Sequence, residues 1–164
     1  MSLRIATPAD QPLLEKWDQE PDVVFCTGEK PPPDEDDWDW GVELARNVSW
    51  REQLIIQEDA RPIGVVQIID PRVEETHYWG ECEPDLRAID IWLGEPGDRS
   101  RGLGRQAMEL TIARCFAPKN VKAIIIDPLV ANVRAIKFYE RLGFKFIGER
   151  YFGNDHCHVM RLDR

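Results

Sequence analysis

Residues 121–127 read VKAIIID, a short run that is apolar almost throughout. Such a run predicts a strand buried on both faces, as in the interior of a parallel or mixed sheet. Helical patterns flank it at 102–116 and at 132–143, where Asn132 can cap the helix and Gly143 can end it. The chain is therefore predicted to be an α/β fold with a mixed sheet.

The other elements follow from local patterns. A helix is expected from Pro8 to about Gln19, and residues 21–41 are expected to be irregular, with a possible helix start only at DEDDWDW, because three prolines interrupt them. Residues 71–86 are polar and predicted to be a loop. Strands are predicted at 3–6, at QLIIQED and PIGVVQIID (a hairpin turning at Ala60-Arg61), at 87–94, and at KFIGERYF and HCHVMRLD. The order is β-α-α-β-β-β-α-β-α-β-β, with residues 1–164 as a single domain.

Composition narrows the function classes. Hydrophobic residues make up 43% and charged residues 31%, which indicates neither a disordered nor a membrane-embedded chain. The net charge of −9 disfavours a nucleic-acid partner and favours a cationic one, although acidity also serves solubility. No signal peptide is recognised, and four cysteines without a CxxC pair fit a reduced, cytoplasmic protein.

The segment RSRGLGRQ, residues 99–106, joins the strand at 87–94 to the following helix. Glycines at this turn leave backbone N–H groups free at a helix N-terminus, which favours an anion such as a pyrophosphate. The spacing matches neither a GxxxxGK[ST] loop nor GxGxxG. A purely structural role for the glycines is the alternative.

Two blocks carry a family resemblance. RSRGLG resembles the [QR]-x-x-G-x-[GA] loop of the GCN5-related N-acetyltransferases (GNAT), through Arg99, Gly102 and Gly104. About 30 residues later, NVRAIKFYERLGF resembles that family's N-x-x-A-x-x-F/Y-Y-x-x-x-G-F block. The resemblance implies a mixed, mostly antiparallel sheet of six to seven strands, splayed in the middle and flanked by about four helices.

It also implies acetyl-CoA as the acyl donor, with no metal. The implied cofactor-binding residues are Ile91, Trp92, Leu93, Arg99, Arg101, Gly102, Leu103, Gly104, Arg105, Gln106 and Asn132. Tyr139 would lie near the departing thiolate and act as the general acid. The alternative for Tyr139 is a core aromatic residue whose hydroxyl is satisfied.

Within the family, AID, RSRGLG and IDPLVANVRAIKFYERLGF resemble the aminoglycoside 6′-N-acetyltransferases, whose two acceptor aspartates map onto Asp90 and Asp127. A carboxylate beside the amine orients it and helps remove its proton before it attacks a thioester. Asp90 is therefore predicted to be catalytic as well as substrate-binding. The alternatives are an ion pair of Asp90 with Arg87 or another arginine, and turn capping by Asp127.

Acidic and aromatic residues interleave in DEDDWDW (34–40) and EETHYWGECEPD (74–85). From these segments Trp38, Glu75 and Trp79 are predicted to extend the acceptor site, and Trp40 and Tyr78 could also stack on sugar faces or cations. A solvated helix start is the alternative for the first segment. His156 and His158 lack a third ligand in the sequence, so no metal is expected.

The chain is therefore predicted to transfer acetyl from acetyl-CoA to a primary amine, foremost the 6′-amine of an aminoglycoside. The alternatives are a protein N-terminus or polyamine acetyltransferase, and a non-catalytic acyl-CoA sensor. The expected partner is a cationic small molecule, and no nucleic acid or membrane is expected to bind. The protein is expected to be a monomer or a homodimer.

Overall fold

The computed structural model describes residues 1–27 and 38–164. Within these residues, seven strands form a single sheet in the order β1-β2-β3-β4-β5-β7-β6. The strands are β1 (Ser2–Ile5), β2 (Arg51–Glu58), β3 (Arg61–Ile69), β4 (Leu86–Leu93), β5 (Ala123–Ile126), β6 (Lys145–Phe152) and β7 (Asp155–Asp163). The helices are α1 (Gln11–Trp17), α2 (Pro21–Cys26), α3 (Trp40–Ala45), α4 (Leu103–Cys115) and α5 (Val133–Arg141), with 3₁₀ turns at Pro8–Asp10 and Pro96–Asp98.

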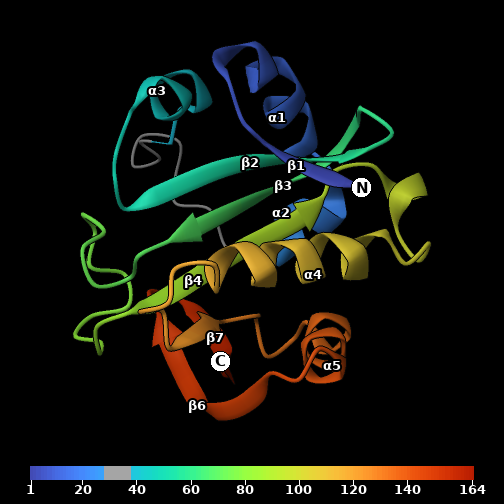
Figure 1. Ribbon diagram of the computed structural model, residues 1–164. Helices are drawn as coiled ribbons and strands as arrows, with labels where there is room; N and C mark the ends of the chain where they lie inside the picture. Colours follow the sequence, from blue (N-terminus) through green and yellow to red (C-terminus); the bar gives the residue numbers. More distant parts are fainter. Residues whose placement is uncertain (28–37) are drawn as a thin grey trace.

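The predicted hairpin and mixed sheet are confirmed, although the turn is at Asp59 and Ala60 rather than at Ala60 and Arg61. β2 and β3 pair antiparallel around Asp59 and Ala60, both of which have positive φ (49° and 67°), as a two-residue primed hairpin turn requires. Every described strand pairing is antiparallel except that of β4 with β5. The parallel pair arises because the chain crosses over through α4 between these strands (Figure 1).

The sheet opens between β4 and β5. Their register is limited to three pairs, Leu86 with Ala123, Arg87 with Ile124 and Ala88 with Ile125. Beyond these pairs, the last residues of β4, from Ile89 to Leu93, pair only with β3. The expected splay is therefore present, and one side of the β4 backbone is left without a neighbouring strand.

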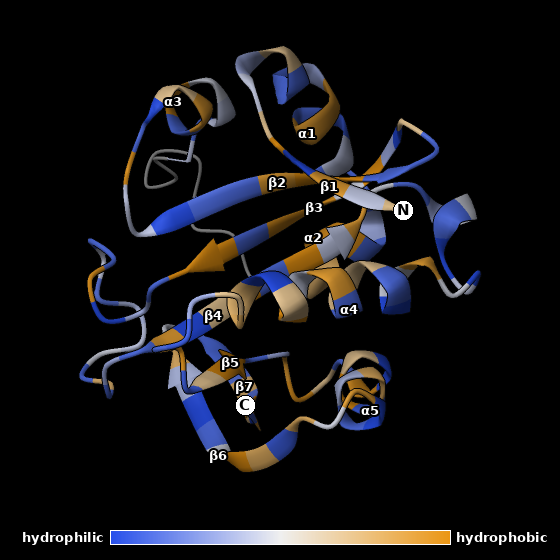
Figure 2. Cartoon of the chain, viewed as in Figure 1, coloured by the Kyte–Doolittle hydropathy of each residue, from blue (hydrophilic) through white to orange (hydrophobic). Residues whose placement is uncertain are grey.

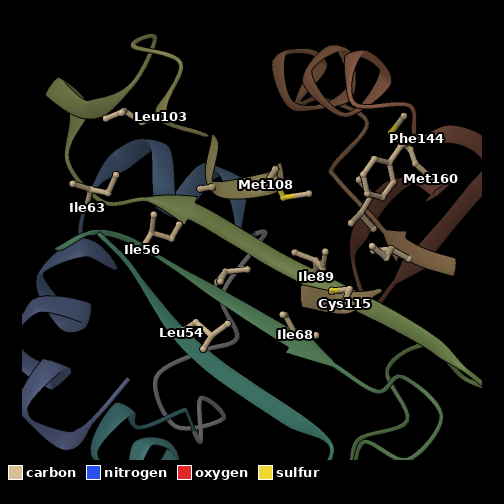
Figure 3. Close-up of a cluster of buried hydrophobic side chains, with 14 residues drawn as sticks. Leu54, Ile56, Ile63, Ile68, Ile89, Leu103, Met108, Cys115, Phe144 and Met160 are labelled. Carbon is tan, nitrogen blue, oxygen red and sulfur yellow. The ribbon is translucent and has the colours of Figure 1, made fainter. Parts of the chain in front are cut away.

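Each face of the sheet has its own hydrophobic core. On one face, side chains of β2–β5 and β7 pack against α4 and α5 in a cluster that includes Ile89, Met108 and Met160, and Figure 3 shows it extending from Leu103 to Phe144. On the other face, Ile55 and Val65 pack with residues of α1 and α3. Figure 2 shows hydrophobic and hydrophilic residues on both α4 and α5, as expected of helices that pack by one side.

The expectation that residues 21–41 begin as an irregular segment is wrong, whereas the possible helix start in DEDDWDW is confirmed. Pro21 opens α2, where its fixed φ suits the first helical turn, and the helix ends at Cys26. α3 begins at Trp40, and the Asp39 carboxylate caps it by accepting a hydrogen bond of 2.9 Å from the Val42 N–H. The triple proline and residues 34–37 lie outside the described residues. Within the described ranges, no helix is long and apolar enough to cross a membrane.

Candidate active site

A cavity of about 930 Å³ lies where β4 and β5 separate. Its walls include the end of β4 from Ile89 to Leu93, the end of β5 with Asp127, and residues of α2 and α5. The N-terminal turn of α4 closes one end, and the loop before β4 lies at the other. The splay therefore places an open strand edge, a helix N-terminus and two carboxylates around one space.

The glycine turn gives α4 an open N-terminus. Gly102 has φ +79°, a left-handed conformation that favours glycine, and a Cβ there would meet no atom within 4 Å. The Gln106 N–H donates to the Gly102 carbonyl (3.3 Å) within the helix. The N–H groups of Leu103, Gly104 and Arg105 precede that first helical bond and are available to an anion.

The three arginines of the turn point in different directions. Arg99 lines the cavity, forms an ion pair with Asp22 of α2 and donates to the carbonyls of Leu93 and Gly94 (3.3 and 3.4 Å). Arg105 also lines the cavity and pairs with Glu109.

Arg101, in contrast, pairs with Glu58 and Asp98 and is absent from the cavity wall. The Leu103 side chain is buried in the core, so only its backbone faces the turn. Of the predicted phosphate-binding group, Arg99, Gly102, Gly104 and Arg105 line the cavity, together with the predicted strand residues Ile91, Trp92 and Leu93.

Asp90 and Asp127 both line the cavity, one from each side of the splay. Water reaches Asp90 through the cavity, yet protein surrounds the carboxyl on most sides. Burial and the nearby charge of Asp127 raise the pKa of Asp90 to about 7. Arg87, the alternative partner of Asp90, pairs with Asp70 instead, and no ion pair of Asp90 occurs within residues 1–27 and 38–164.

A tyrosine distinguishes the two carboxylates. The Tyr78 hydroxyl donates a hydrogen bond of 2.7 Å to Asp127 Oδ2, and its ring stacks on Phe152 at 4.4 Å. Burial raises the pKa of Asp127, whereas the hydrogen bond from Tyr78 opposes that rise by favouring the anion. Asp90 receives no such bond from the described side chains, so Asp127 is better suited to hold a fixed negative charge.

Tyr139 and Asn132 approach the cavity from α5. The Asn132 side chain accepts a hydrogen bond from the Ala135 N–H (3.1 Å), which confirms it as the helix cap, and its Nδ2 contacts the Cys26 sulfur at 3.3 Å. Burial and the neighbouring Asp90 raise the pKa of the Tyr139 phenol. Tyr139 therefore keeps its proton at neutral pH.

The predicted acceptor residues lie at different places. Trp38 lines the cavity beside Trp40 and Arg51, whose guanidinium is 5.3 Å from the Trp38 ring centroid. Trp79 also lines the cavity but is 95% buried, since only 5% of its surface is exposed. Glu75 is outside the cavity wall and pairs with Arg46.

The sequence reasoning did not identify Gln67 or the contact between Tyr78 and Asp127. Gln67 lines the cavity and is only 7% exposed, although it lies between Val66 and Ile68 in the apolar strand RPIGVVQII. A glutamine in such a run is the signal that was available for it, because a buried polar side chain needs a partner.

The two histidines near the C-terminus serve other contacts. His156 pairs with Glu149 and stacks on Tyr151, whereas His158 stacks on Phe146. Among the side chains that the structure describes, no group of three His, Cys, Asp or Glu residues could hold a metal ion.

Comparison with known proteins agrees with this architecture. The family model "Acetyltransferase (GNAT) domain" matches residues 6–152. The chain is 26% identical over 161 residues to the aminoglycoside N(6′)-acetyltransferase type 1 of Klebsiella pneumoniae, covering 88% of this chain and 74% of that protein. It is also 32% identical over 74 residues to a kanamycin resistance protein of Rhizobium radiobacter, covering 44% of this chain and 68% of that one.

Among solved structures, the crystal structure of aminoglycoside acetyltransferase AAC(6′)-Ib in complex with coenzyme A superposes with a TM-score of 0.84 and 25% identity, covering 99% of this chain and 94% of that one. The fold, the splay and the family match define an acetyltransferase. The chain belongs to the GNAT family.

Proposed function

We propose that this acetyltransferase transfers the acetyl group of acetyl-CoA to the 6′-amine of an aminoglycoside. The observation that carries the proposal is the pair of carboxylates, Asp90 and Asp127, which face one cavity beside the open edge of β4. The matched relatives include an aminoglycoside N(6′)-acetyltransferase and a kanamycin resistance protein, which supports this choice of acceptor.

The cavity suits acetyl-CoA along its length. The free N–H groups of Leu103 and Gly104, with the guanidinium groups of Arg99 and Arg105, offer positive potential for a pyrophosphate. The unpaired side of β4 between Ile91 and Leu93 offers peptide hydrogen-bonding groups to the amides of a pantetheine arm. Acetyl-CoA supplies the acyl group as an activated thioester.

The two carboxylates divide the work on the acceptor. Asp127, whose anion Tyr78 stabilises, binds the ammonium group and holds it beside the strand edge. Asp90, with a pKa of about 7, accepts the proton that the amine must lose before it attacks a carbonyl carbon. The bond that breaks in the amine is N–H, and the new bond joins nitrogen to the acetyl carbon.

Tyr139 completes the proton balance. Its raised pKa keeps the phenol protonated at neutral pH, and its position on the cavity wall allows it to donate that proton to the departing thiolate. Asn132 contacts the sulfur of Cys26 in α2 and lies on the same wall, where its amide can contact the pantetheine arm.

A thiol-release assay with acetyl-CoA and a matched pair of acceptors tests the proposal. Neomycin B and paromomycin I differ only at the 6′ position, where the first has an amine and the second a hydroxyl. The enzyme is expected to release CoA with neomycin and not with paromomycin.

Equal release with both would indicate another acetylated amine and contradict the regiochemistry. Turnover of spermidine or of a peptide α-amine in preference to neomycin would instead favour polyamine or protein acetylation. Binding of acetyl-CoA without release in any arm would indicate a non-catalytic acyl-CoA sensor.

A further inference from the structure

The connection between β4 and α4 carries a buried carboxylate, Asp98. It is only 4% exposed and ends the 3₁₀ turn Pro96–Asp98, shortly before the glycine turn. Arg61, the first residue of β3, donates to both oxygens of Asp98, from Nη1 to Oδ2 (2.8 Å) and from Nη2 to Oδ1 (2.7 Å). This bidentate contact joins the β4–α4 connection to the hairpin of β2 and β3, 37 residues away in the chain.

Asp98 belongs to a cluster of two carboxylates and two guanidinium groups. Arg101 also donates to Asp98 Oδ1 (2.9 Å), and Glu58 pairs with both Arg61 and Arg101. The hydrogen bond from Arg61 holds the pKa of Asp98 below its usual value, so the carboxyl stays ionised at neutral pH. The cluster is therefore formally neutral, and its four residues are absent from the cavity wall. Its effect on a bound ligand is exerted through the backbone that it holds.

The backbone after Asp98 adopts a conformation that needs support. Ser100 has φ +62°, in the left-handed region, where a residue with a side chain is unfavourable and persists only if its surroundings hold it. On one side of Ser100, Arg99 pairs with α2 and donates to two main-chain carbonyls. On the other side, Arg101 is held by Asp98. These contacts fix the direction in which α4 begins, and with it the direction of the free N–H groups.

We propose that Asp98 is a positioning residue for the donor substrate, and that Arg61 fixes its orientation. Together they hold residues 99–102 so that the N–H groups at the start of α4 meet the pyrophosphate of acetyl-CoA. Apolar residues often replace a buried ion pair without loss of stability, so a pair located beside a ligand site is better explained by the conformation that it imposes. This inference rests on the proposed location of the pyrophosphate and gives a role to residues that do not touch it.

The other end of α4 provides a matched control. Arg114 donates to Glu52 of β2 (2.5 and 2.8 Å), so this ion pair joins α4 itself to the same hairpin. With a helical rise of about 1.5 Å per residue, Arg114 lies roughly 16 Å along the helix from Leu103. Neither Arg114 nor Glu52 lines the cavity. Arg114→Gln therefore removes a similar contact without affecting the glycine turn.

Two donors separate an effect on the pyrophosphate from an effect on the fold. Acetyl-CoA and S-acetylpantetheine share the thioester and the pantetheine arm, but only the first has the pyrophosphate and its nucleotide. Calorimetry without an acceptor gives both Kd values, that of S-acetylpantetheine by displacement, whichever amine the enzyme acetylates. The native protein is expected to bind acetyl-CoA more tightly. Arg61→Gln and Asp98→Asn are expected to raise the Kd for acetyl-CoA about tenfold, the value of one charge-assisted hydrogen bond, and to leave that for S-acetylpantetheine unchanged.

The two substitutions change the local charge in opposite directions. Arg61→Gln makes the surroundings of the pyrophosphate more negative, and Asp98→Asn makes them more positive. A loss of affinity in both is expected if the cluster positions the backbone, whereas tighter binding in Asp98→Asn would show that the charge acts directly and would overturn the inference. Arg61→Lys answers the same question if Asp98→Asn does not fold, because the half-exposed Arg61 would keep its charge and lose only the bidentate contact. A loss of affinity is expected for Arg61→Lys as well.

Arg114→Gln is expected to bind both donors as the native protein does, and the Tm of each variant reports on folding. Equal weakening of both donors in Arg61→Gln and Asp98→Asn would overturn the inference, because the cluster would then support the fold in general. Unchanged affinity of these variants for acetyl-CoA would also overturn it. A native protein that binds S-acetylpantetheine as tightly as acetyl-CoA would refute the proposed location of the pyrophosphate itself.

Discussion

The Tyr78 hydroxyl donates a 2.7 Å hydrogen bond to Asp127, a residue 49 positions later in the chain, and this bond separates the roles of two neighbouring carboxylates. Asp127 and Asp90 share one cavity and the same acidic surroundings. The one that Tyr78 contacts is favoured as an anion, so the proton that the pair can hold resides on Asp90.

Tyr78→Phe should weaken acceptor binding. Removing the hydroxyl raises the pKa of Asp127 further and frees its carboxylate to move, while the phenyl ring keeps its stacking on Phe152. The KM for an aminoglycoside is expected to rise about tenfold, the value of one charge-assisted hydrogen bond, with little change in the KM for acetyl-CoA. Tyr151→Phe is the control, because Tyr151 is exposed and lies outside the cavity. A similar rise in both KM values would contradict the role given to Tyr78.

The pH dependence should report Asp90 as the base. Asp90 accepts a proton only when ionised, so kcat/KM for the acceptor is expected to rise about tenfold per pH unit below pH 7 and to level off above it. The pH profile of kcat should show the same acidic limb, that is, the same rise with pH, but at lower pH, because the bound ammonium favours the ionised carboxylate of Asp90. Initial rates between pH 5 and 9 measure both. Asp90→Asn should lower kcat by about 10²–10³ and abolish the limb, and a limb that persists in this variant would belong to another group.

Asp90 should also limit stability at alkaline pH. Its folded-state pKa is raised above that of the unfolded chain, so its favourable contribution is complete below about pH 4 and is lost as the pH rises through 7. Asp90→Asn is therefore expected to raise the Tm at pH 8 by about 2–4 °C, a figure that allows for screening by water in the cavity, and to leave it nearly unchanged at pH 4. Calorimetry at the two pH values decides this, and an equal shift at both would assign the gain to packing.

Salt should weaken capture of the acceptor more than binding of acetyl-CoA. The chain carries a net charge of −9, which attracts a polycation, and exposed charges are screened over about 8–10 Å at 0.1–0.15 M salt. The KM for the aminoglycoside is therefore expected to rise several-fold between about 0.05 and 0.5 M KCl, with a smaller change for acetyl-CoA. Parallel salt dependence of the two constants would count against electrostatic capture.

Local patterns were sufficient to predict most of the sheet. The hydrophobic patterns of QLIIQED, PIGVVQIID and AIII each reflect how one strand is buried. Such a pattern predicts a strand without knowledge of the strands that it pairs with. α2 was missed because its six residues are too few to show a helical period. What holds it near β4 includes the ion pair of Asp22 with Arg99, which lies 77 residues away.

Site residues could be predicted from the sequence only where the local pattern of their own strand or turn marked them. Asp90 and Gly102 could be found because each interrupts an otherwise regular local pattern. Arg101 could not be separated from Arg99, since the residue types do not reveal that Arg101 pairs with Glu58 and Asp98 whereas Arg99 pairs with Asp22. The role of Tyr78 depends on Asp127, a partner that another element supplies.

The separation of β4 from β5 has a consequence for exchange of backbone hydrogens. Between Ile91 and Leu93, the amides directed away from β3 have no strand to protect them, although they lie at the centre of a seven-stranded sheet. They should exchange with deuterium as quickly as amides of an edge strand while the cavity is open to water. When a pantetheine arm occupies that edge, these amides should become protected from exchange. The bound donor substrate would then take the place of the strand that β4 lacks beyond Ala88.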